Sequence, residues 1–416
     1  MKNIIAVFLL FLSFANAAQQ PFVANMDESK VGEISLPNPL VLPNGVTIKT
    51  QSDWEKNRSY WLSQFQNVMY GKMPIRKVKQ SYQLLSKTES MNGKAIQYIW
   101  KITFEDKYSV IVLGVLPKTN KKVPVFLGLN FCGNQTTSSD SNIPVFEKYV
   151  VCNEKGAYEN HLSQPASRGT WASKWQFEKL IEAGYGSITV ACGDFEEDKV
   201  DGFKTGIRTI LADKLGLKAE EWSANGAWAW GLSRTVDFLE KIPEVNAKKI
   251  ILHGHSRLGK AAVWAGANDR RFAAVILNES GEGGAAITRR NYGENLWRIT
   301  NSFPHWFLSS YKNYAYKENE LPFDQHILLS LIAPRPLYVA SAMGDQWSDP
   351  KGEFLSAKNA EVVYDLYGKT GLGTNDAPAL NTPIGNQIRY HIREGNHDIT
   401  AYDWEQYIIF ANQLIK

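Results

Sequence analysis

The sequence has 416 residues, and 46 lysine and arginine residues stand against 42 aspartate and glutamate residues, so the formal net charge is only +4. Because these charges are spread along the chain without long runs of one sign, nucleic acid is not an expected partner. The three cysteines, Cys132, Cys152 and Cys192, permit at most one internal disulfide, which excludes a small scaffold built on disulfides.

The first 17 residues have the pattern of a secretory signal peptide. Lys2 supplies a positive charge, residues 4–14 form an apolar run, and residues 15–17, Ala-Asn-Ala, form a small-x-small cleavage site. The apolar run is shorter than the roughly 20 residues that cross a bilayer, so we interpret it as a cleaved leader and expect no membrane span. The sequence therefore predicts a secreted or periplasmic protein whose mature chain starts after Ala17.

Residues 18–416 alternate between strand-like and helix-like segments, without a linker, a repeat or a low-complexity tract, so we expect one catalytic domain and a monomer. Short apolar runs bounded by turn residues predict strands at 108–116, 123–130, 186–192, 249–253, 273–277, 336–341 and 388–392. Helical spacing predicts helices at 171–183, 225–242 and 257–267, whereas 362–367 fits either a helix or extended chain. This alternation predicts an α/β fold: a mostly parallel central sheet with helices on both faces, a three-layer sandwich.

Residues 250–260, Ile-Ile-Leu-His-Gly-His-Ser-Arg-Leu-Gly-Lys, combine a strand, a glycine-flanked turn and a helix. This is the pattern of the nucleophile elbow of α/β-hydrolases, in which a sharp turn raises a serine hydroxyl above the sheet edge at a helix N-terminus. Ser256 is the candidate nucleophile. The usual elbow has its second glycine two residues after the serine, whereas here it is Gly259. The alternative is an ordinary strand-to-helix turn in which Ser256 is only the N-cap.

In the chain order of α/β-hydrolases, an acid and then a histidine follow the serine. His391 lies inside the last expected strand, and His305 lies among aromatic residues where a core or loop position is expected. His397 lies in the turn 394–398, just past that strand, where an imidazole can accept the serine proton and return it to the leaving alcohol. The alternative is a turn histidine that caps the next helix.

Two carboxylates at strand ends compete for the place of the acid. Glu279 follows the strand 273–277 almost directly, and Asp345 follows the strand 336–341 through a short loop. Either side chain can orient the imidazole and stabilise its cation, and either can instead belong to a loop salt bridge. The sequence leaves both open.

Two cations follow the candidate nucleophile closely. Arg257 is its immediate neighbour, and Lys260 lies one helical turn further on, so both can face the mouth of the site. A cation there can stabilise an oxyanion or bind an acidic or hydroxyl-rich substrate. The alternative is a solvated helix face.

Taken together, these motifs resemble those of the glucuronoyl esterases, carbohydrate esterase family 15. Residues 254–260 are similar to the family signature Gly-Cys/His-Ser-Arg-x-Gly-Lys. The resemblance continues through 278–281 (Asn-Glu-Ser-Gly), 291–297 (Asn-Tyr-Gly-Glu-Asn-Leu-Trp), 331–336 (Leu-Ile-Ala-Pro-Arg-Pro) and 344–347 (Gly-Asp-Gln-Trp), and so covers most of the mature chain.

The resemblance implies an α/β-hydrolase that cleaves the ester between 4-O-methyl-glucuronic acid of glucuronoxylan and an alcohol of lignin. We expect the reaction to pass through an acyl-enzyme on Ser256, without a metal or an organic cofactor. Ser256 would be the nucleophile and His397 the base, while Glu279 matches the usual acid of the family and bacterial members often carry an acid at the position of Asp345. Arg257 would donate to the oxyanion through its side chain.

The resemblance also implies a sugar site. Lys260, Glu294 and Trp347 match residues that hold the uronate ring, and their side chains supply a donor, an acceptor and a flat stacking face. Two other functions remain open. An acetyl-xylan or general carboxylesterase shares the catalytic residues, and a non-catalytic carbohydrate-binding protein can keep the same fold.

Overall fold

The computed structural model describes residues 22–415, so the expected signal peptide lies outside the described part of the chain. In that part, one sheet contains ten strands, and two short strands form a separate ribbon. The sheet strands are β1 (Gln80–Ser90), β2 (Ala95–Phe104), β3 (Tyr108–Pro117), β4 (Val123–Asn130), β7 (Gly186–Ala191), β8 (Val245–His255), β9 (Ala274–Asn278), β10 (Leu337–Ala342), β11 (Ile384–Gly385) and β12 (Ile388–Arg393), and the ribbon consists of β5 (Tyr158–Glu159) and β6 (Leu162–Ser163).

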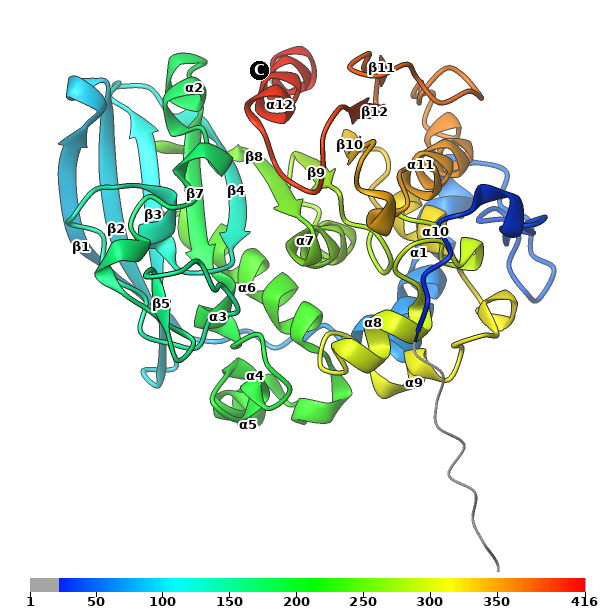
Figure 1. Ribbon diagram of the computed structural model, residues 1–416, viewed down its shortest axis with the longest axis horizontal. Coiled ribbons are helices and arrows are strands. Elements are labelled where there is room, and N and C mark those ends of the chain that lie inside the picture. Colours follow the sequence, from blue (N-terminus) through cyan, green and yellow to red (C-terminus); the bar gives the residue numbers. More distant parts are fainter. Residues whose placement is uncertain (1–21, 416) are drawn as a thin grey trace, which may run out of the picture.

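The spatial order of the sheet is β1-β2-β3-β7-β4-β8-β9-β10-β12-β11 (Figure 1). Neighbours from β7 to β12 pair in parallel, whereas β1, β2 and β3 extend one end of the sheet in antiparallel pairs and β11 pairs antiparallel at the other end. The carboxyl ends of the parallel strands therefore meet at one edge, where ligands bind in sheets of this kind.

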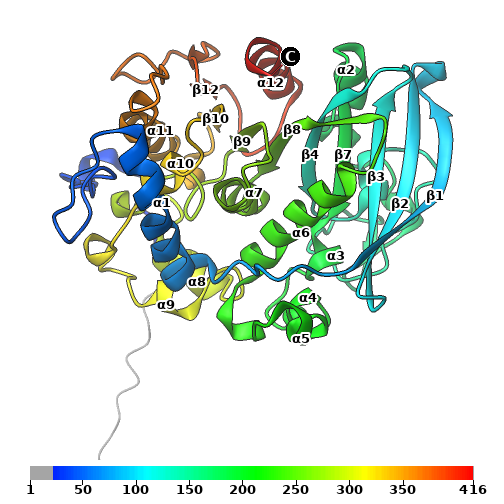
Figure 2. The same cartoon turned by 180° about the vertical axis from the view of Figure 1, so that it is seen from behind.

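Helices cover both faces of the sheet, which confirms the expected three-layer α/β architecture. In Figure 1, α2 and α12 lie above the sheet and α6 and α7 below it, and Figure 2 shows α1 and α6 from behind. The helices are α1 (Gln51–Phe65), α2 (Phe177–Glu182), α3 (Cys192–Phe195), α4 (Ile207–Ile210), α5 (Ala212–Leu215), α6 (Ala224–Leu239), α7 (Arg257–Asn268), α8 (Leu296–Ser302), α9 (Ser309–Lys312), α10 (Gln325–Ser330), α11 (Pro350–Asp365) and α12 (Ala401–Leu414).

The central strands are apolar because each is buried on both faces. In β8, Ile250 and Leu252 pack into the core shared with α6 and α7, whereas Ile251 between them packs into the core shared with α2 and α12. Successive side chains of a strand point to opposite faces, so both alternating sets of residues must be apolar here. This burial explains why the sequence pattern located these strands.

The sequence pattern gave no expectation for β1, β2, α1 or α12, and the helix expected at residues 171–183 is wrong in part. A short 3-10 turn, Ala172–Lys174, and α2 replace the single expected helix, because Gln176 between them adopts a left-handed backbone conformation with φ 45°. The expected helix 225–242 begins at Ala224, and the side chain of Ser223 accepts a hydrogen bond from the backbone N–H of Gly226. Residues 362–365 belong to α11.

Several features lie outside the sheet. Cys132 and Cys152 form a disulfide, and Cys192 is a buried free thiol.

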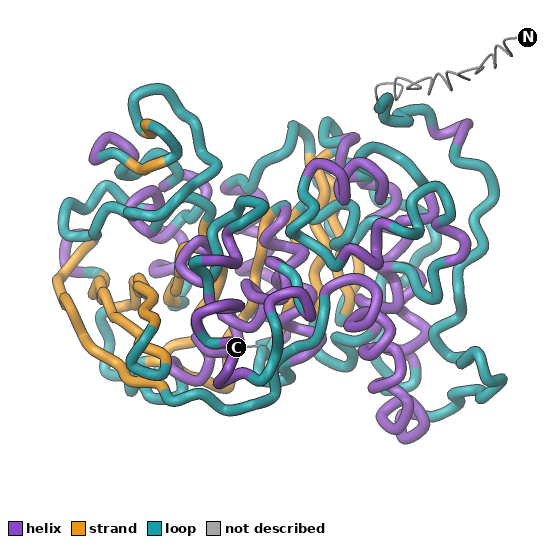
Figure 3. The backbone as a smooth tube through the Cα atoms, turned by 90° about the horizontal axis from the view of Figure 1, so that it is seen from below, coloured by secondary structure: helices purple, strands orange, loops and turns teal. Residues whose placement is uncertain are grey.

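None of the helices between residues 22 and 415 is long and apolar enough to cross a membrane. Loops and turns, teal in Figure 3, make up a large share of the backbone. The single-domain organisation of residues 18–416 stays a prediction.

Candidate active site

A cavity of about 400 Å³ lies at the carboxyl edge of the parallel strands. All eight site residues expected from the sequence line it, although they come from segments up to 141 residues apart in the chain (256 to 397). These residues are Ser256, Arg257, Lys260, Glu279, Glu294, Asp345, Trp347 and His397.

The candidate nucleophile lies on a strained turn between β8 and α7. Ser256 has φ 55° and ψ −131°, a conformation that costs a residue other than glycine of order 1–3 kcal/mol and is typical of functional sites. Its backbone N–H donates to the carbonyl of Asn278 at 2.9 Å, which fixes the turn against β9. Within the described chain, its side chain makes no capping hydrogen bond to α7, so a purely capping role has no support.

The glycines on either side of the turn are required by close packing. A Cβ atom on Gly254 would lie 2.2 Å from the carbonyl oxygen of Leu258. One on Gly259 would lie 2.8 Å from Cβ of Ser280. The helix therefore passes closest to the neighbouring loop three residues after the serine, which accounts for the unusual spacing of the second glycine.

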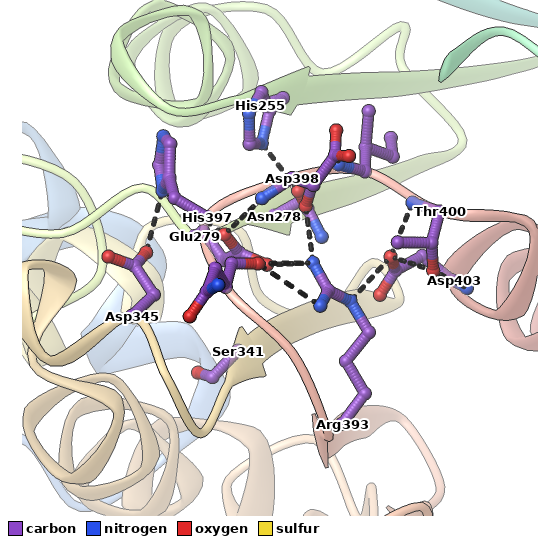
Figure 4. A network of polar contacts seen from close by, with 12 residues as sticks. His255, Asn278, Glu279, Ser341, Asp345, Arg393, His397, Asp398, Thr400 and Asp403 are labelled. Atoms are coloured by element: carbon purple, nitrogen blue, oxygen red, sulfur yellow. Dashed lines mark hydrogen bonds and ion pairs between the residues drawn. The ribbon is translucent and has the colours of Figure 1, made fainter. Parts of the chain in front are cut away.

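His397 contacts both candidate acids through the same ring nitrogen (Figure 4). Its Nδ1 lies 2.6 Å from Oδ2 of Asp345 and 3.1 Å from Oε2 of Glu279. A proton on Nδ1 satisfies these carboxylates, so Nε2 is the nitrogen left to accept a proton from a serine hydroxyl. The two acids that the sequence left open thus share one position.

The surroundings shift the pKa values of the two acids in opposite directions. Burial disfavours the carboxylate of Glu279 and raises its pKa to about 7, although His397 and Arg393 oppose the shift. Burial acts on Asp345 in the same direction, but the hydrogen bond and charge of His397, together with the hydrogen bond to Ser348, outweigh burial, and the pKa of Asp345 is lowered. Asp345 is therefore the more fully ionised partner at neutral pH.

The same contacts favour the charged imidazole. Burial alone would lower the pKa of His397, but its hydrogen bonds to Asp345 and Glu279 outweigh burial and raise the pKa to about 9. The arrangement stabilises the imidazolium that forms when the ring accepts a proton.

Arg393, at the end of β12, fixes the turn that carries His397. It is buried and donates from Nη2 to Glu279 and to the carbonyl of Asp398 at 2.6 Å, and from Nε to Asp403 at 2.8 Å (Figure 4). The backbone N–H of Asp398 donates in turn to Glu279 at 2.9 Å. Glu279 thus holds both the imidazole and the backbone turn around it.

His255 packs beside the imidazole of His397. The two rings lie with their centroids 4.6 Å apart, and Nδ1 of His255 is hydrogen-bonded to Oδ1 of Asn278. The amide nitrogen of Asn278 donates to the hydroxyl of Tyr407 at 3.0 Å. Burial lowers the pKa of His255 to about 3, so a neutral ring supports His397 on this side.

The guanidinium of Arg257 is held by the carboxylate of Asp198. This buried carboxylate also accepts from Nε2 of His305 at 2.8 Å and from the indole N–H of Trp306 at 2.7 Å. Burial opposes its ionisation, but Arg257 and His305 outweigh it and lower the pKa of Asp198 to about 2. The guanidinium also lies over the rings of Phe131 and Trp306, 5.3 Å and 5.0 Å from their centroids.

The rest of the cavity offers groups suited to hydroxyls and to a flat ring. Lys260, 3% exposed, donates to the carbonyl of Ser280 at 2.6 Å, and its Nζ lies 3.9 Å from Oε2 of Glu294. Burial lowers the pKa of Lys260 and raises that of Glu294. The backbone N–H of Glu294 donates to the carbonyl of Trp347, which presents a 38% exposed indole at the rim.

The described chain contains one group with metal-ligand geometry in this region. Single ligand atoms of His255, Glu279 and His397 lie within 4.8 Å of one another. Each of these side chains already has a hydrogen-bonding partner within the protein.

Sequence reasoning missed several residues of the site. Arg298, Phe303, Trp306 and Ser348 also line the cavity, and Asp198 lies behind Arg257. A signal for Asp198 was present, because the acidic run that contains it follows the buried strand β7 and the carboxyl ends of parallel strands share one edge. Arg298 lies in the short helix α8, and Phe303, Trp306 and Ser348 lie in turns or irregular segments, so no local sequence pattern places these four side chains in the cavity.

The chain is similar to several known proteins. The family model described as "Glucuronyl esterase, fungi" matches residues 215–368. A glucuronoyl esterase structure from Solibacter usitatus is 46% identical, with a TM-score of 0.87 over 93% of this chain and 100% of that one. A structure of a promiscuous CE15 esterase from a marine bacterial metagenome is 40% identical, with a TM-score of 0.89 over 94% of this chain and 100% of that one. The 4-O-methyl-glucuronoyl methylesterase 1 of Phanerochaete chrysosporium is 36% identical over 45% of this chain and 41% of its own length.

Proposed function

Because the chain belongs to the glucuronoyl esterases of carbohydrate esterase family 15, we propose that it hydrolyses esters of 4-O-methyl-glucuronate through an acyl-enzyme on Ser256. The natural substrate is the ester that links this acid in glucuronoxylan to an alcohol of lignin. The observation that carries the proposal is the convergence of a strained serine, a doubly anchored imidazole and a buried Lys260–Glu294 pair in one cavity.

The proposed reaction follows from which groups of the site can accept and donate a proton. Nε2 of His397 accepts the hydroxyl proton as Oγ of Ser256 attacks the ester carbonyl, and the imidazolium then gives this proton to the departing alcohol. A water attacks the resulting acyl-enzyme by the same route, which releases the uronic acid and restores Ser256. Asp345 and Glu279 stabilise the imidazolium at both stages.

The negative charge that forms on the carbonyl oxygen needs donors. We propose the backbone N–H of Arg257, which opens α7, and its guanidinium, because both follow the nucleophile directly. Loss of one such donor typically costs about 3 kcal/mol of barrier. Asp198 fixes the guanidinium, so little reorganisation is required when the charge develops.

The uronate ring occupies the part of the cavity between Lys260, Glu294 and Trp347. A buried lysine and a buried glutamate supply a donor and an acceptor to adjacent sugar hydroxyls, and the indole covers the apolar face of the ring. A substrate without these hydroxyls leaves the buried charges without new partners, which disfavours simple acetate esters.

Steady-state kinetics on a substrate panel test the proposal. Wild-type protein and the variants Ser256→Ala and Lys260→Ala are compared on benzyl and methyl glucuronate, the galacturonate analogue and an acetate ester. We expect Ser256→Ala to lose turnover of all of them while it remains folded, and Lys260→Ala to lose glucuronate turnover selectively. Retained activity in Ser256→Ala would reject the nucleophile, and equal losses in Lys260→Ala would reject the sugar site.

The same panel decides between this proposal and a broader esterase. The relative from the marine metagenome is described as promiscuous, so a general carboxylesterase remains the second candidate. Comparable kcat/KM values for acetate and glucuronate esters would favour it.

We further propose that residues 1–17 are removed on export and that residues 18–416 act as a secreted or periplasmic monomer of one domain. The composition of the N-terminal residues supports the cleavage. N-terminal sequencing of the exported protein tests the cleavage site, and sedimentation analysis tests the oligomeric state.

A further inference from the structure

Four aromatic side chains form a row that begins at the rim of the cavity. The ring centroid of Phe22 lies 6.3 Å from that of Trp347, edge to face, and 5.4 Å from that of Trp297, on which it stacks. Trp297 lies 6.2 Å from Tyr316. We call Trp347, Phe22, Trp297 and Tyr316 the aromatic row. Its two ends are exposed, Trp347 to 38% and Tyr316 to 68%.

The row is built from segments that are distant in the sequence and are tied together. Trp297 belongs to α8, whereas Phe22 belongs to the N-terminal segment, drawn in dark blue in Figure 1. The carbonyl of Asn25 accepts a hydrogen bond from the N–H of Gly293 at 2.8 Å, and Glu28 pairs with the buried Arg290. These bonds attach the N-terminal segment to the residues just before α8.

The row is continuous with the cavity at two points. Trp347 and Arg298 both line the cavity, and the guanidinium of Arg298 lies 5.6 Å from the ring centroid of Phe22. A ligand that leaves the cavity on this side therefore passes over the row. Its surface combines the exposed rings of Trp347 and Tyr316 and the partly exposed rings of Phe22 and Trp297 with the planar donors of one arginine.

This combination matches a neutral sugar chain. Pyranose rings present apolar C–H faces that pack on aromatic rings, and their hydroxyl rims accept hydrogen bonds from donors such as a guanidinium. A strongly acidic chain would instead require several cations, and Arg298 is the one charged side chain that the ring contacts place beside the described row.

We propose that the aromatic row binds the neutral sugar chain from which the glucuronate branch projects. The inference rests on the proposed function, because the uronate in the cavity fixes where the chain begins. With the branch in contact with Trp347, the chain runs outwards over Phe22, Trp297 and Tyr316. The row thereby favours esters on polysaccharide over the same esters on a free uronate.

Kinetics on two substrates with the same ester test this inference. One is the methyl ester of free 4-O-methyl-glucuronate, and the other is that ester carried as a branch on a xylo-oligosaccharide. For Trp297→Ala, Tyr316→Ala and the double variant, we expect the ratio of kcat/KM for the oligosaccharide to kcat/KM for the free uronate to fall about 5- to 10-fold. An unchanged ratio would overturn the inference.

Tyr82→Ala is the matched control, because Tyr82 is 37% exposed on β1 at the far end of the sheet. Its ratio should equal that of the wild type, and an equal fall there would also overturn the inference. If the row serves only to seat the N-terminal segment, the row variants lower the Tm while the ratio stays constant. That outcome rejects the sugar site.

Direct binding separates the inference from the proposed function. Calorimetry of Ser256→Ala with an unesterified xylo-oligosaccharide should detect binding that weakens about 5- to 10-fold in Ser256→Ala/Trp297→Ala. Binding of this kind without esterase activity in the wild type would support the row and reject the esterase. Esterase activity without such binding would reject the row alone.

Discussion

The guanidinium of Arg257 donates a hydrogen bond to the buried carboxylate of Asp198, which lies 59 residues earlier in the chain. Arg257 is thereby fixed beside the nucleophile by a residue that itself lies outside the cavity lining. Preorganised donors contribute most to catalysis when they need not move as charge develops. In the proposed mechanism, Asp198 is thus a positioning residue that acts through Arg257.

A double-mutant cycle tests this relationship. We expect Asp198→Asn to lower kcat about 10- to 100-fold with a smaller effect on KM, and Arg257→Ala to lower it about 10²- to 10³-fold. The double variant should be no slower than Arg257→Ala, because Asp198 has nothing left to position. If the losses of kcat in the two single variants multiply in the double variant, Asp198 acts by another route.

The two acids should partly replace each other. Glu279→Gln and Asp345→Asn each leave one carboxylate against Nδ1 of His397, so we expect each to lower kcat roughly 10- to 100-fold. Glu279→Gln/Asp345→Asn should approach the roughly 10⁴-fold loss typical when a triad acid is removed. A single substitution that already causes the full loss would assign the role to one acid.

The pH profile follows from the raised pKa of His397. A base must be neutral to accept a proton, so kcat/KM should increase with pH through the raised pKa, above the ordinary imidazole value of about 6.5. Asp345→Asn removes the largest favourable partner and should move this acidic limb to lower pH. An acidic limb of the wild-type kcat/KM profile with a midpoint at or below pH 6.5, or a shift of this limb to higher pH in Asp345→Asn, would contradict the assigned role of His397.

The packing at Gly259 predicts a graded effect of side-chain size. Gly259→Ala places a Cβ atom 2.8 Å from Ser280 and should lower the free energy of unfolding by about 1–3 kcal/mol, with a loss of activity because the turn at Ser256 shifts. Gly259→Val should be worse. Denaturant unfolding and kinetics measure both, and an unaltered Gly259→Ala would show that the helix can move at no cost.

The sequence predicted the strands in the middle of the sheet best and missed β1 and β2 at its end. The continuous apolar runs of β4 and β9 indicate buried strands. In β1, apolar and polar residues alternate little and most side chains are exposed, so the sequence pattern does not predict this strand. The expected helix 171–183 was wrong in part because a single left-handed residue, Gln176, interrupts it. Helical periodicity carries no signal for such a backbone change.

The candidate site was predictable where the chemistry lies in a local motif. Ser256 follows a strand and a glycine, and His397 lies just past the last strand, so strand ends alone located both. Arg393 contacts Glu279, which is 114 residues away in the chain, and Asp198 contacts Arg257, which is 59 residues away. Only the order of strands in the sheet brings the two members of each pair together. The choice between Glu279 and Asp345 stayed open for a physical reason, because both contact the same nitrogen.

Mass spectrometry of the protein after treatment with a phosphonate ester tests the central claim most directly. The account predicts one adduct per chain, on the peptide that contains Ser256, with labelling strongly slowed in His397→Ala. An intact mass after prolonged exposure, or an adduct on a different residue, would contradict it.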